Sequence, residues 1–353
     1  MVYNRQKKMK KILLVLASLA FSSMCLAQLQ LATLEHDSVV SVYYGASALQ
    51  AAHTDAVNGD IITLSPGMFT ACDLTKSVTV RGAGMCNDTA AGVVRTVING
   101  SFNIGATNTS GIDSSNTLTL EGLYCGEVRY RHAYAPMLIK CHFTRLGRYT
   151  VNGGGPLNNA QVVNCVICNL DGSYIQNTMF VNSVIVEAQN TNYGAGSGNN
   201  SIGNTFTNCI IGISNLTKYH SNHYFYNCIL YADCTDATIN TSNNWVTSDY
   251  CIGINTNANN YGYYTALATD NHLNNYNSLS TVFKHFDGTY TDGVSFELQD
   301  NIAASIMGAD GTQVGIYGGA MPFDPLVFNH KVTAARRTSP DGFLDLEIEL
   351  YDE

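Results

Sequence analysis

Charged side chains are scarce in this sequence, since only 13% of its 353 residues are Asp, Glu, Lys or Arg. Acidic residues outnumber basic ones by 27 to 18, and the formal net charge is −9. A protein that binds the phosphate backbone of a nucleic acid needs a basic surface, so this composition argues against a nucleic-acid partner. Long apolar segments are also missing after residue 27, and we therefore expect no membrane span.

The first 27 residues have the pattern of a signal peptide. One arginine and four lysines precede an apolar run at residues 12–21, which is too short to span a bilayer. Small residues at the end of the segment predict cleavage before Gln28. We expect a secreted, periplasmic or outer-surface protein. Its mature chain has 13 basic against 27 acidic residues, a formal net charge of about −14.

A short phrase returns in the middle of the chain. The phrase is a short apolar segment with an Asn-Cys pair in its middle, and it occurs at residues 162–167, 206–211 and 225–230. A variant at residues 181–185 has serine in place of the cysteine. The asparagines are 18, 26 and 19 residues apart. Repeats of one strand and one polar loop predict a solenoid whose turns stack at about 4.8 Å. The stacked amides would then hydrogen-bond from turn to turn as a ladder of Asn164, Asn182, Asn208 and Asn227.

The cysteines follow the same repeat. Ten remain after cleavage, and an exported protein is allowed disulfides. Four of them hold the same position in the phrase, which favours a buried column of free thiols: Cys141, Cys165, Cys209 and Cys228. The single C-x-x-C, Cys165 to Cys168, has no second pair, so we expect no metal site.

The residues near the mature N-terminus carry a family resemblance. A short helix is expected from residue 48 to about 57, followed by Gly59-Asp60, an apolar strand, Pro66-Gly67 and then Val80-Arg81-Gly82-Ala83-Gly84. This order resembles the opening turn of right-handed parallel β-helix proteins of the pectin-lyase-like group. Residues 310–323 resemble the closing segment of secreted bacterial β-helix proteins of unassigned function.

The resemblance covers roughly residues 40–320 and implies an all-β fold. We expect a right-handed parallel β-helix, a solenoid, over residues 28–323, with an N-terminal capping helix over the open end of the coil. Residues 324–353 are expected to form a short C-terminal β-hairpin appendage, because residues 343–351 alternate between apolar and acidic side chains.

Candidate site residues gather where basic and aromatic side chains alternate, between residues 129 and 149. Enzymes of the pectin-lyase-like group act on polysaccharides. A lyase needs a basic side chain as general base and a cation, calcium or arginine, to stabilise the enolate. The catalytic candidates are Lys140, Arg145 and Arg148, and the ligand-binding candidates are Arg129, Arg131, Tyr130, Tyr149 and, in a later loop, Tyr263.

Three interpretations of this cluster remain open: an ordinary solvated face, a site for an acidic glycan, and a catalytic site. Strand alternation places Arg129 and Tyr130 on opposite sides, which weakens the idea of one shared face. The paired carboxylates of glycosidases on this fold are not evident. We expect a non-catalytic, glycan-binding or adhesive surface protein without a cofactor. The alternatives are a polysaccharide lyase acting on a uronate-containing polymer, for which calcium would be the candidate cofactor, and a structural spacer.

Overall fold

The computed structural model describes residues 30–87, 92, 94–105, 117–149, 155–172, 174–189, 201–213, 223–232, 246–255, 272 and 274–324. Three expectations lie outside these residues: the signal peptide, the candidate Tyr263, and the C-terminal appendage after Asp324.

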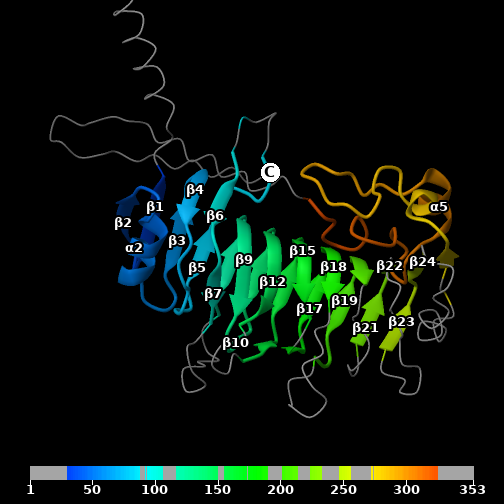
Figure 1. The fold of residues 1–353 in the computed structure, drawn as a ribbon, viewed down its shortest axis with the longest axis horizontal. Helices are drawn as coiled ribbons and strands as arrows, with labels where there is room; N and C mark the ends of the chain where they lie inside the picture. Colours follow the sequence, from blue (N-terminus) through cyan, green and yellow to red (C-terminus); the bar gives the residue numbers. More distant parts are fainter. Residues whose placement is uncertain are drawn as a thin grey trace, which may run out of the picture.

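The strands of the described chain form three β-sheets (Figure 1). The first sheet has, in spatial order, the strands β2 (Val39–Tyr44), β1 (Leu31–His36), β3 (Ile61–Leu64), β5 (Thr79–Arg81), β8 (Thr119–Glu121), β11 (Met137–Ile139), β14 (Gln161–Val163), β17 (Met179–Val181), β19 (Thr205–Thr207), β21 (His223–Tyr226) and β23 (Val246–Asp249).

The second sheet runs in the order β25 (Asn274–Tyr276), β24 (Ile252–Asn255), β22 (Ile229–Ala232), β20 (Ile210–Ile213), β18 (Val184–Gln189), β15 (Val166–Asp171), β12 (His142–Arg148), β9 (Tyr124–Tyr130), β6 (Thr96–Asn99) and β4 (Gly67–Thr70), with β7 (Phe102–Ile104) also paired to β9. A third, small sheet contains β10 (Ala133–Tyr134), β13 (Leu157–Asn158) and β16 (Ile175–Gln176).

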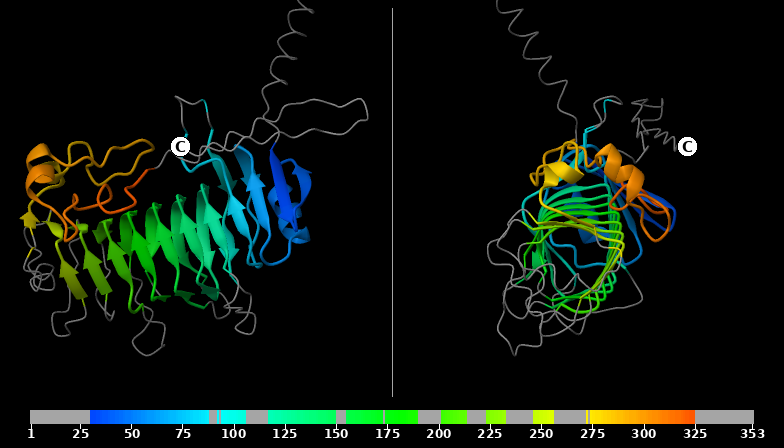
Figure 2. Two further views of the ribbon diagram at one scale, coloured as in Figure 1. Left: turned by 180° about the vertical axis from the view of Figure 1, so that it is seen from behind. Right: turned by 90° about the vertical axis from the view of Figure 1, so that its right-hand side faces the viewer.

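The chain visits these sheets in rotation. After β14 in the first sheet it forms β15 in the second, β16 in the third, and then β17, which pairs in parallel with β14. Corresponding residues therefore stack, with Leu138 beside Val162 and Val162 beside Phe180. Seen end-on, the successive strands lie one behind another (Figure 2). Long parallel sheets of this kind are compatible with a parallel β-helix.

Apolar columns fill the space between the sheets. Phe206 lies between two other phenylalanines, with ring centroids 4.7 Å from Phe180 and 4.8 Å from Phe225. Beside them runs a column of fully buried thiols that form no disulfide, Cys141, Cys165, Cys209, Cys228 and Cys251. The predicted column of buried, unpaired cysteines is therefore confirmed for all four residues that carried it.

The asparagines of the repeat form the corner between the first and second sheets. Asn164, Asn182, Asn208 and Asn227 have φ angles of 53°, 45°, 53° and 54°. Asparagine tolerates this left-handed conformation better than other residues with a side chain, so it allows a sharp turn between two strands. The predicted stacking is confirmed, because the strand residues just before these asparagines are in register from turn to turn.

The predicted amide ladder is wrong for two members of the column. Oδ1 of Asn164 and Oδ1 of Asn208 accept no hydrogen bond. The amide of Asn182 instead donates to the carbonyl oxygens of Ile316 and Gly318, at 2.8 and 2.7 Å. Oδ1 of Asn227 accepts from the backbone N–H of Ala309 at 2.9 Å. These side chains hold a later segment of the chain rather than one another.

That later segment, residues 277–324, covers the outer face of the second sheet instead of adding another strand to it (Figures 1 and 2). It contains the helices α4 (Leu279–Val282) and α5 (Asp300–Ser305). Its apolar side chains form a second hydrophobic cluster with outward residues of the sheet, among them Val166, Val184, Ile210, Ile229 and Ile252. The second sheet is thus buried on both faces along this part of its strands.

A third helix, α2 (Ala48–Asp55), lies beside β1 and β2 at the end of the stack formed by the earliest strands (Figure 1). The spacing of Leu49, Ala52 and Ala56 predicts one apolar face, and all three are buried, Ala56 directly after the end of the helix. The helix expected from residue 48 is present, and it ends two residues earlier than the expected limit of 57.

Candidate functional site

A bend in the long strands β9 and β12 creates the candidate site. In β9 the inward residues Cys125 and Val128 are three positions apart, and Phe143 and Leu146 repeat this step in β12. Regular alternation would place them two apart. Two consecutive residues between these inward positions therefore face outward. In the second half of each strand, the outward side chains form a row that residues 277–324 do not cover.

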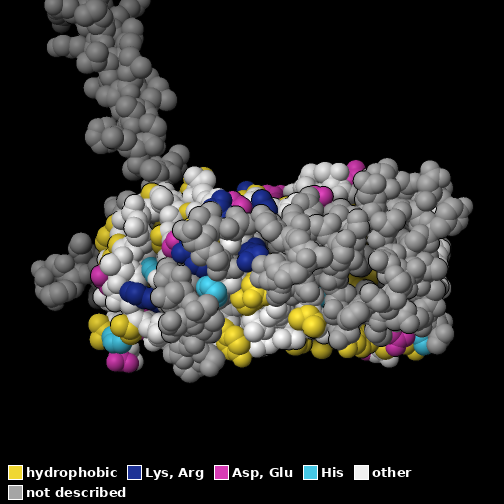
Figure 3. Space-filling view, turned by 60° about the horizontal axis from the view of Figure 1, so that its bottom comes forward, with side chains coloured by type: hydrophobic (Ala, Val, Ile, Leu, Met, Phe, Trp, Pro, Cys, Tyr) yellow, Lys and Arg dark blue, Asp and Glu magenta, His cyan; other side chains and the backbone are white. Residues whose placement is uncertain are grey.

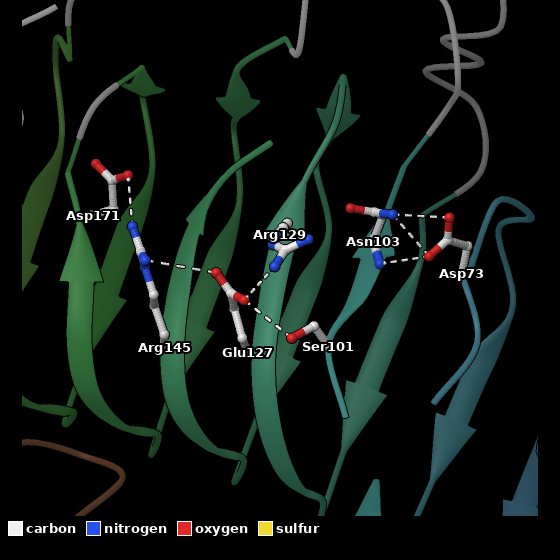
Figure 4. A network of polar contacts seen from close by, with 7 residues as sticks. All are labelled: Asp73, Ser101, Asn103, Glu127, Arg129, Arg145 and Asp171. Carbon is white, nitrogen blue, oxygen red and sulfur yellow. Dashed lines mark hydrogen bonds and ion pairs between the residues drawn. The ribbon is translucent and has the colours of Figure 1, made fainter. Parts of the chain in front are cut away.

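This outer row carries a network of polar contacts (Figure 4). Arg129 donates to Glu127 at 2.5 Å, and the hydroxyl of Ser101 donates to the same carboxylate at 3.0 Å. Arg145 lies 3.7 Å from Glu127 on one side and 3.5 Å from Asp171 on the other. We call the set in Figure 4 the charged row: Asp73, Ser101, Asn103, Glu127, Arg129, Arg145 and Asp171.

Arg129 and Glu127 lie in the same strand, β9, whereas Arg145 pairs with carboxylates of the two neighbouring strands. Arg145 is in register with Glu127, and Gly147 with Arg129. A Cβ atom at Gly147 would lie 3.2 Å from Cβ of Asp171 and 3.3 Å from Nε of Arg145. A larger residue would press on both members of that ion pair, so the glycine leaves room for Arg145 to reach Asp171.

The charged row differs in exposure from one member to the next. The Arg145 and Arg129 side chains are 46% and 38% exposed, whereas Asp171 is only 5% exposed. The hydrogen bond from Arg129 lowers the pKa of Glu127, and the same bond raises the pKa of Arg129. Both groups are therefore held in their charged forms at neutral pH.

Two further arginines lie over tyrosine rings. The guanidinium carbon of Arg131 is 3.8 Å from the ring centroid of Tyr149, and that of Arg148 is 4.9 Å from the ring of Tyr174. Cation–π contacts of this kind hold a planar cation against an aromatic face. In Figure 3, Lys and Arg side chains gather over the half of the molecule that carries the earlier strands.

The structure brings together only some of the predicted site residues. Arg129 and Arg145 join the charged row, while Arg131, Tyr149 and Arg148 form the two stacks described above. Lys140 lies at the corner before β12, in a left-handed conformation with φ of 48°, in the position that asparagine holds in later turns. The three catalytic candidates therefore have different surroundings.

Tyr130 is the one ligand-binding candidate that the structure excludes. Its side chain is fully buried, and its hydroxyl donates to the backbone carbonyl of Asp171 at 2.9 Å. The expectation that it offers a ring to a ligand is wrong because it faces the core, as the alternation with Arg129 indicated. Tyr263 lies outside the described residues.

A second polar cluster, which the sequence did not reveal, lies under residues 277–324. His142 stacks on Tyr124 at a centroid distance of 4.2 Å and contacts Tyr290 on its other side at 5.2 Å. Its Nε2 is 3.3 Å from the thiol of Cys168. Burial lowers the pKa of His142 from 6.5 to about 4, with smaller opposing contributions from Asp292, which raises it, and Arg95, which lowers it.

We assign this second cluster a structural role rather than a catalytic or metal-binding one. Burial also raises the pKa of Cys168 to about 11, and a protonated thiol is a poor nucleophile and metal ligand. In the described parts of the chain, no group of three or more His, Cys, Asp or Glu side chains is placed to hold a metal ion. The same parts contain no helix with the length and apolar character needed to cross a bilayer.

The low pKa of His142 predicts a contribution to acid unfolding. The unfolded chain takes up this proton near pH 6.5 and the folded chain only near pH 4, so the stabilisation is complete above 6.5 and is lost as pH falls toward 4. The full effect is on the order of 3 kcal/mol. We expect His142→Phe, which keeps a ring against Tyr124, to show a shallower loss of stability between pH 6.5 and 4.

Urea titrations of both proteins at several pH values measure this difference. The comparison removes the contribution of other titrating groups, because they are shared. Parallel pH profiles for the two proteins would contradict the assignment.

Comparisons with known proteins add no family to this description. No model of a protein family matches the chain, and neither a curated protein nor a solved structure with significant similarity was found. The resemblance to the pectin-lyase-like group thus has the residues and sheets of this chain as its only support.

Proposed function

We propose that this chain is an exported right-handed parallel β-helix, closed at one end by α2, that binds glycans without catalysing their cleavage and serves as a glycan-associated or adhesive surface protein. The rotation of the chain through three sheets and the stacked corner asparagines support the coil. Helix α2 supports the cap, since its apolar face is buried beside the first strands. Export is supported by the signal-peptide pattern of residues 1–27.

The charged row is the observation that carries the binding function. Five of its side chains come from β7, β9, β12 and β15, which lie side by side, and Asp73 and Ser101 lie outside these strands, so the row extends across the strands in the direction of the stack (Figure 4). Carboxylates and guanidinium groups alternate along it. Such a surface offers acceptors and donors to the hydroxyl groups of a polysaccharide, and Arg129 and Arg145 offer charge-assisted bonds to sugar carboxylates.

Two features favour binding over lyase chemistry. A lyase base must lose its proton near neutral pH, but the hydrogen bond that Arg129 donates to Glu127 raises the pKa of Arg129. Arg145 is held between Glu127 and Asp171, so its guanidinium group is already engaged by two carboxylates. The row is thus better suited to holding an ordered array of charges than to abstracting a proton.

Glycan-array binding by the mature protein tests this function. We expect acidic polysaccharides to bind, and Arg145→Ala to weaken binding by about tenfold, because it removes charge-assisted hydrogen bonds of roughly 1.5 kcal/mol. Arg81→Ala is a matched control. Arg81 is similarly exposed, at 43%, and is also paired with a glutamate, Glu121, but it lies on the first sheet.

Three results would contradict the proposal. Failure to bind any glycan would favour the structural spacer. Equal losses in Arg145→Ala and Arg81→Ala would place binding elsewhere than the charged row. Formation of an unsaturated product, seen as ultraviolet absorbance during incubation with uronate polymers, would establish the lyase instead.

A further inference from the structure

Strand β2 forms one edge of the first sheet. It pairs with β1 in an antiparallel hairpin, and within the described chain no strand pairs with its other side. The turn between the two strands, Asp37-Ser38, has φ angles of 47° and 66°, as a tight two-residue hairpin requires. The geometry of the hairpin determines which backbone N–H and C=O groups of β2 form hydrogen bonds with β1.

The hydrogen-bond pattern leaves alternate residues of β2 pointing away from β1. The N–H of Gly45 donates to the carbonyl of Gln30 at 2.8 Å, which makes these two a hydrogen-bonded pair. In an antiparallel ladder such pairs alternate, so residues 43, 41 and 39 also bond to β1. The N–H and C=O groups of Val40, Val42 and Tyr44 therefore point to the free edge.

This edge lacks the features that keep β-sheet proteins apart. Its sequence, Val-Val-Ser-Val-Tyr-Tyr, contains no charge, no proline and no glycine, and it is rich in residues with high β-propensity. Natural edge strands are usually protected by charges, prolines or bulges. Val39, Val40 and Tyr44 are 66%, 52% and 56% exposed.

We propose that β2 pairs with β2 of a second copy of this chain, forming a two-fold symmetric dimer through a continuous sheet. Two strands that pair about a two-fold axis must match outward-pointing residues with outward-pointing residues. A register centred on Val42 does so: Val42 faces Val42 of the other copy, and Val40 faces Tyr44.

The side chains suit this register. It places a β-branched residue opposite an aromatic one twice, at the Val40 and Tyr44 pairs, and such cross-strand pairs stabilise sheets. No like charges meet, because β2 has no charged residue. The strand is thus complementary to itself, which is the reason for preferring a second copy to a different partner.

The first test is the molar mass of the mature protein in solution, by light scattering after size-exclusion chromatography. We expect the mass of two chains for the wild type and of one chain for Val42→Pro. Proline removes an N–H that β1 does not use, and edge positions tolerate it. Val40→Lys is a second variant, for use if Val42→Pro does not fold. It places a lysine opposite Tyr44 in both symmetric pairs, and we expect it to be monomeric because a lysine on an edge strand opposes pairing.

The second test fixes the register by cysteine cross-linking. Cα atoms of a hydrogen-bonded antiparallel pair lie about 5.5 Å apart, within the range for a disulfide. Val42→Cys should therefore form a covalent dimer on mild oxidation. Val39→Cys is the matched control: it is the more exposed position, but the two copies of residue 39 would lie about 20 Å apart in this register.

The proposal is overturned if light scattering shows the wild type to be monomeric at every protein concentration tested. This would be the result if another part of its own chain covered the edge. It is overturned as well if the dimer persists in both Val42→Pro and Val40→Lys. Cross-linking of Val39→Cys as efficient as that of Val42→Cys would exclude the register.

Discussion

Phe206→Ala is expected to destabilise the folded chain by about 3 to 5 kcal/mol, the usual cost of emptying a phenylalanine site in a core. Phe206 is the middle ring of a stack, with its plane at 8° to Phe180 and 12° to Phe225. Its removal deprives two neighbours of contacts at once. Because the three rings come from adjacent turns, little else can move in to fill the space.

Urea unfolding followed by circular dichroism measures this loss. Phe206→Leu keeps most of the volume and should lose clearly less stability than the alanine variant. Met179→Ala is the control for a general effect of shortening an apolar side chain, since Met179 is 49% exposed and should change stability little. If Phe206→Ala lost no more than Met179→Ala, the stacked core would be wrong.

Much of the sheet arrangement could be predicted because the repeat phrase places like residues at like positions. Asn164, Asn208 and Asn227 turn the same corner, and the cysteines after them stack in the core. The pattern worked because a corner needs a left-handed residue and the adjacent inward position needs a small apolar one. Both requirements are local, and a single sequence can show them.

The cover of the second sheet was not predicted, although the sequence contained a signal for it. Val166-Ile167, Ile210-Ile211 and Ile229-Leu230 are consecutive apolar residues in strands. A strand with one wet face alternates, whereas a strand buried on both faces does not. These pairs indicated that something covers the outer face, but not that residues 277–324 do so.

The charged row was predicted only in part, because its ion pairs join residues far apart in the sequence. Arg145 meets Asp171 26 residues later and Glu127 18 residues earlier, at distances set by the length of each turn. The cluster of basic residues, with Glu127 near it, was visible in the sequence, but Asp171 was not assigned to it. The extra outward residue at the bend also shifts the alternation that sequence reasoning assumes.

The second large effect is expected at Asn182. Asn182→Ala should cost about 3 kcal/mol or more, for two reasons. The buried carbonyls of Ile316 and Gly318 lose their donor, at roughly 1 to 3 kcal/mol each. Alanine must also adopt the left-handed conformation, with φ of 45°, at a cost of roughly 1 to 2 kcal/mol.

Two comparisons separate these contributions. Asn182→Gly accepts the backbone conformation and loses only the hydrogen bonds, so it should be more stable than Asn182→Ala. Asn164→Ala has the same backbone problem, with φ of 53°, but Oδ1 of Asn164 has no hydrogen-bond partner, so the loss should be smaller. Chemical unfolding gives the order of stability, and limited proteolysis reports whether residues 309–319 are released.

The order of the variants tests the role of the corner asparagines directly. If Asn182 holds residues 277–324 against the sheet, both of its variants expose that segment to protease while Asn164→Ala does not. Equal stability of Asn182→Ala and Asn164→Ala would mean that the bonds to Ile316 and Gly318 contribute nothing. Asn182 would then act only on the backbone, and the outer cover would depend on its other contacts, such as the hydrogen bond from Ala309 to Asn227 and the apolar contacts of Phe283 and Phe286 in the second cluster.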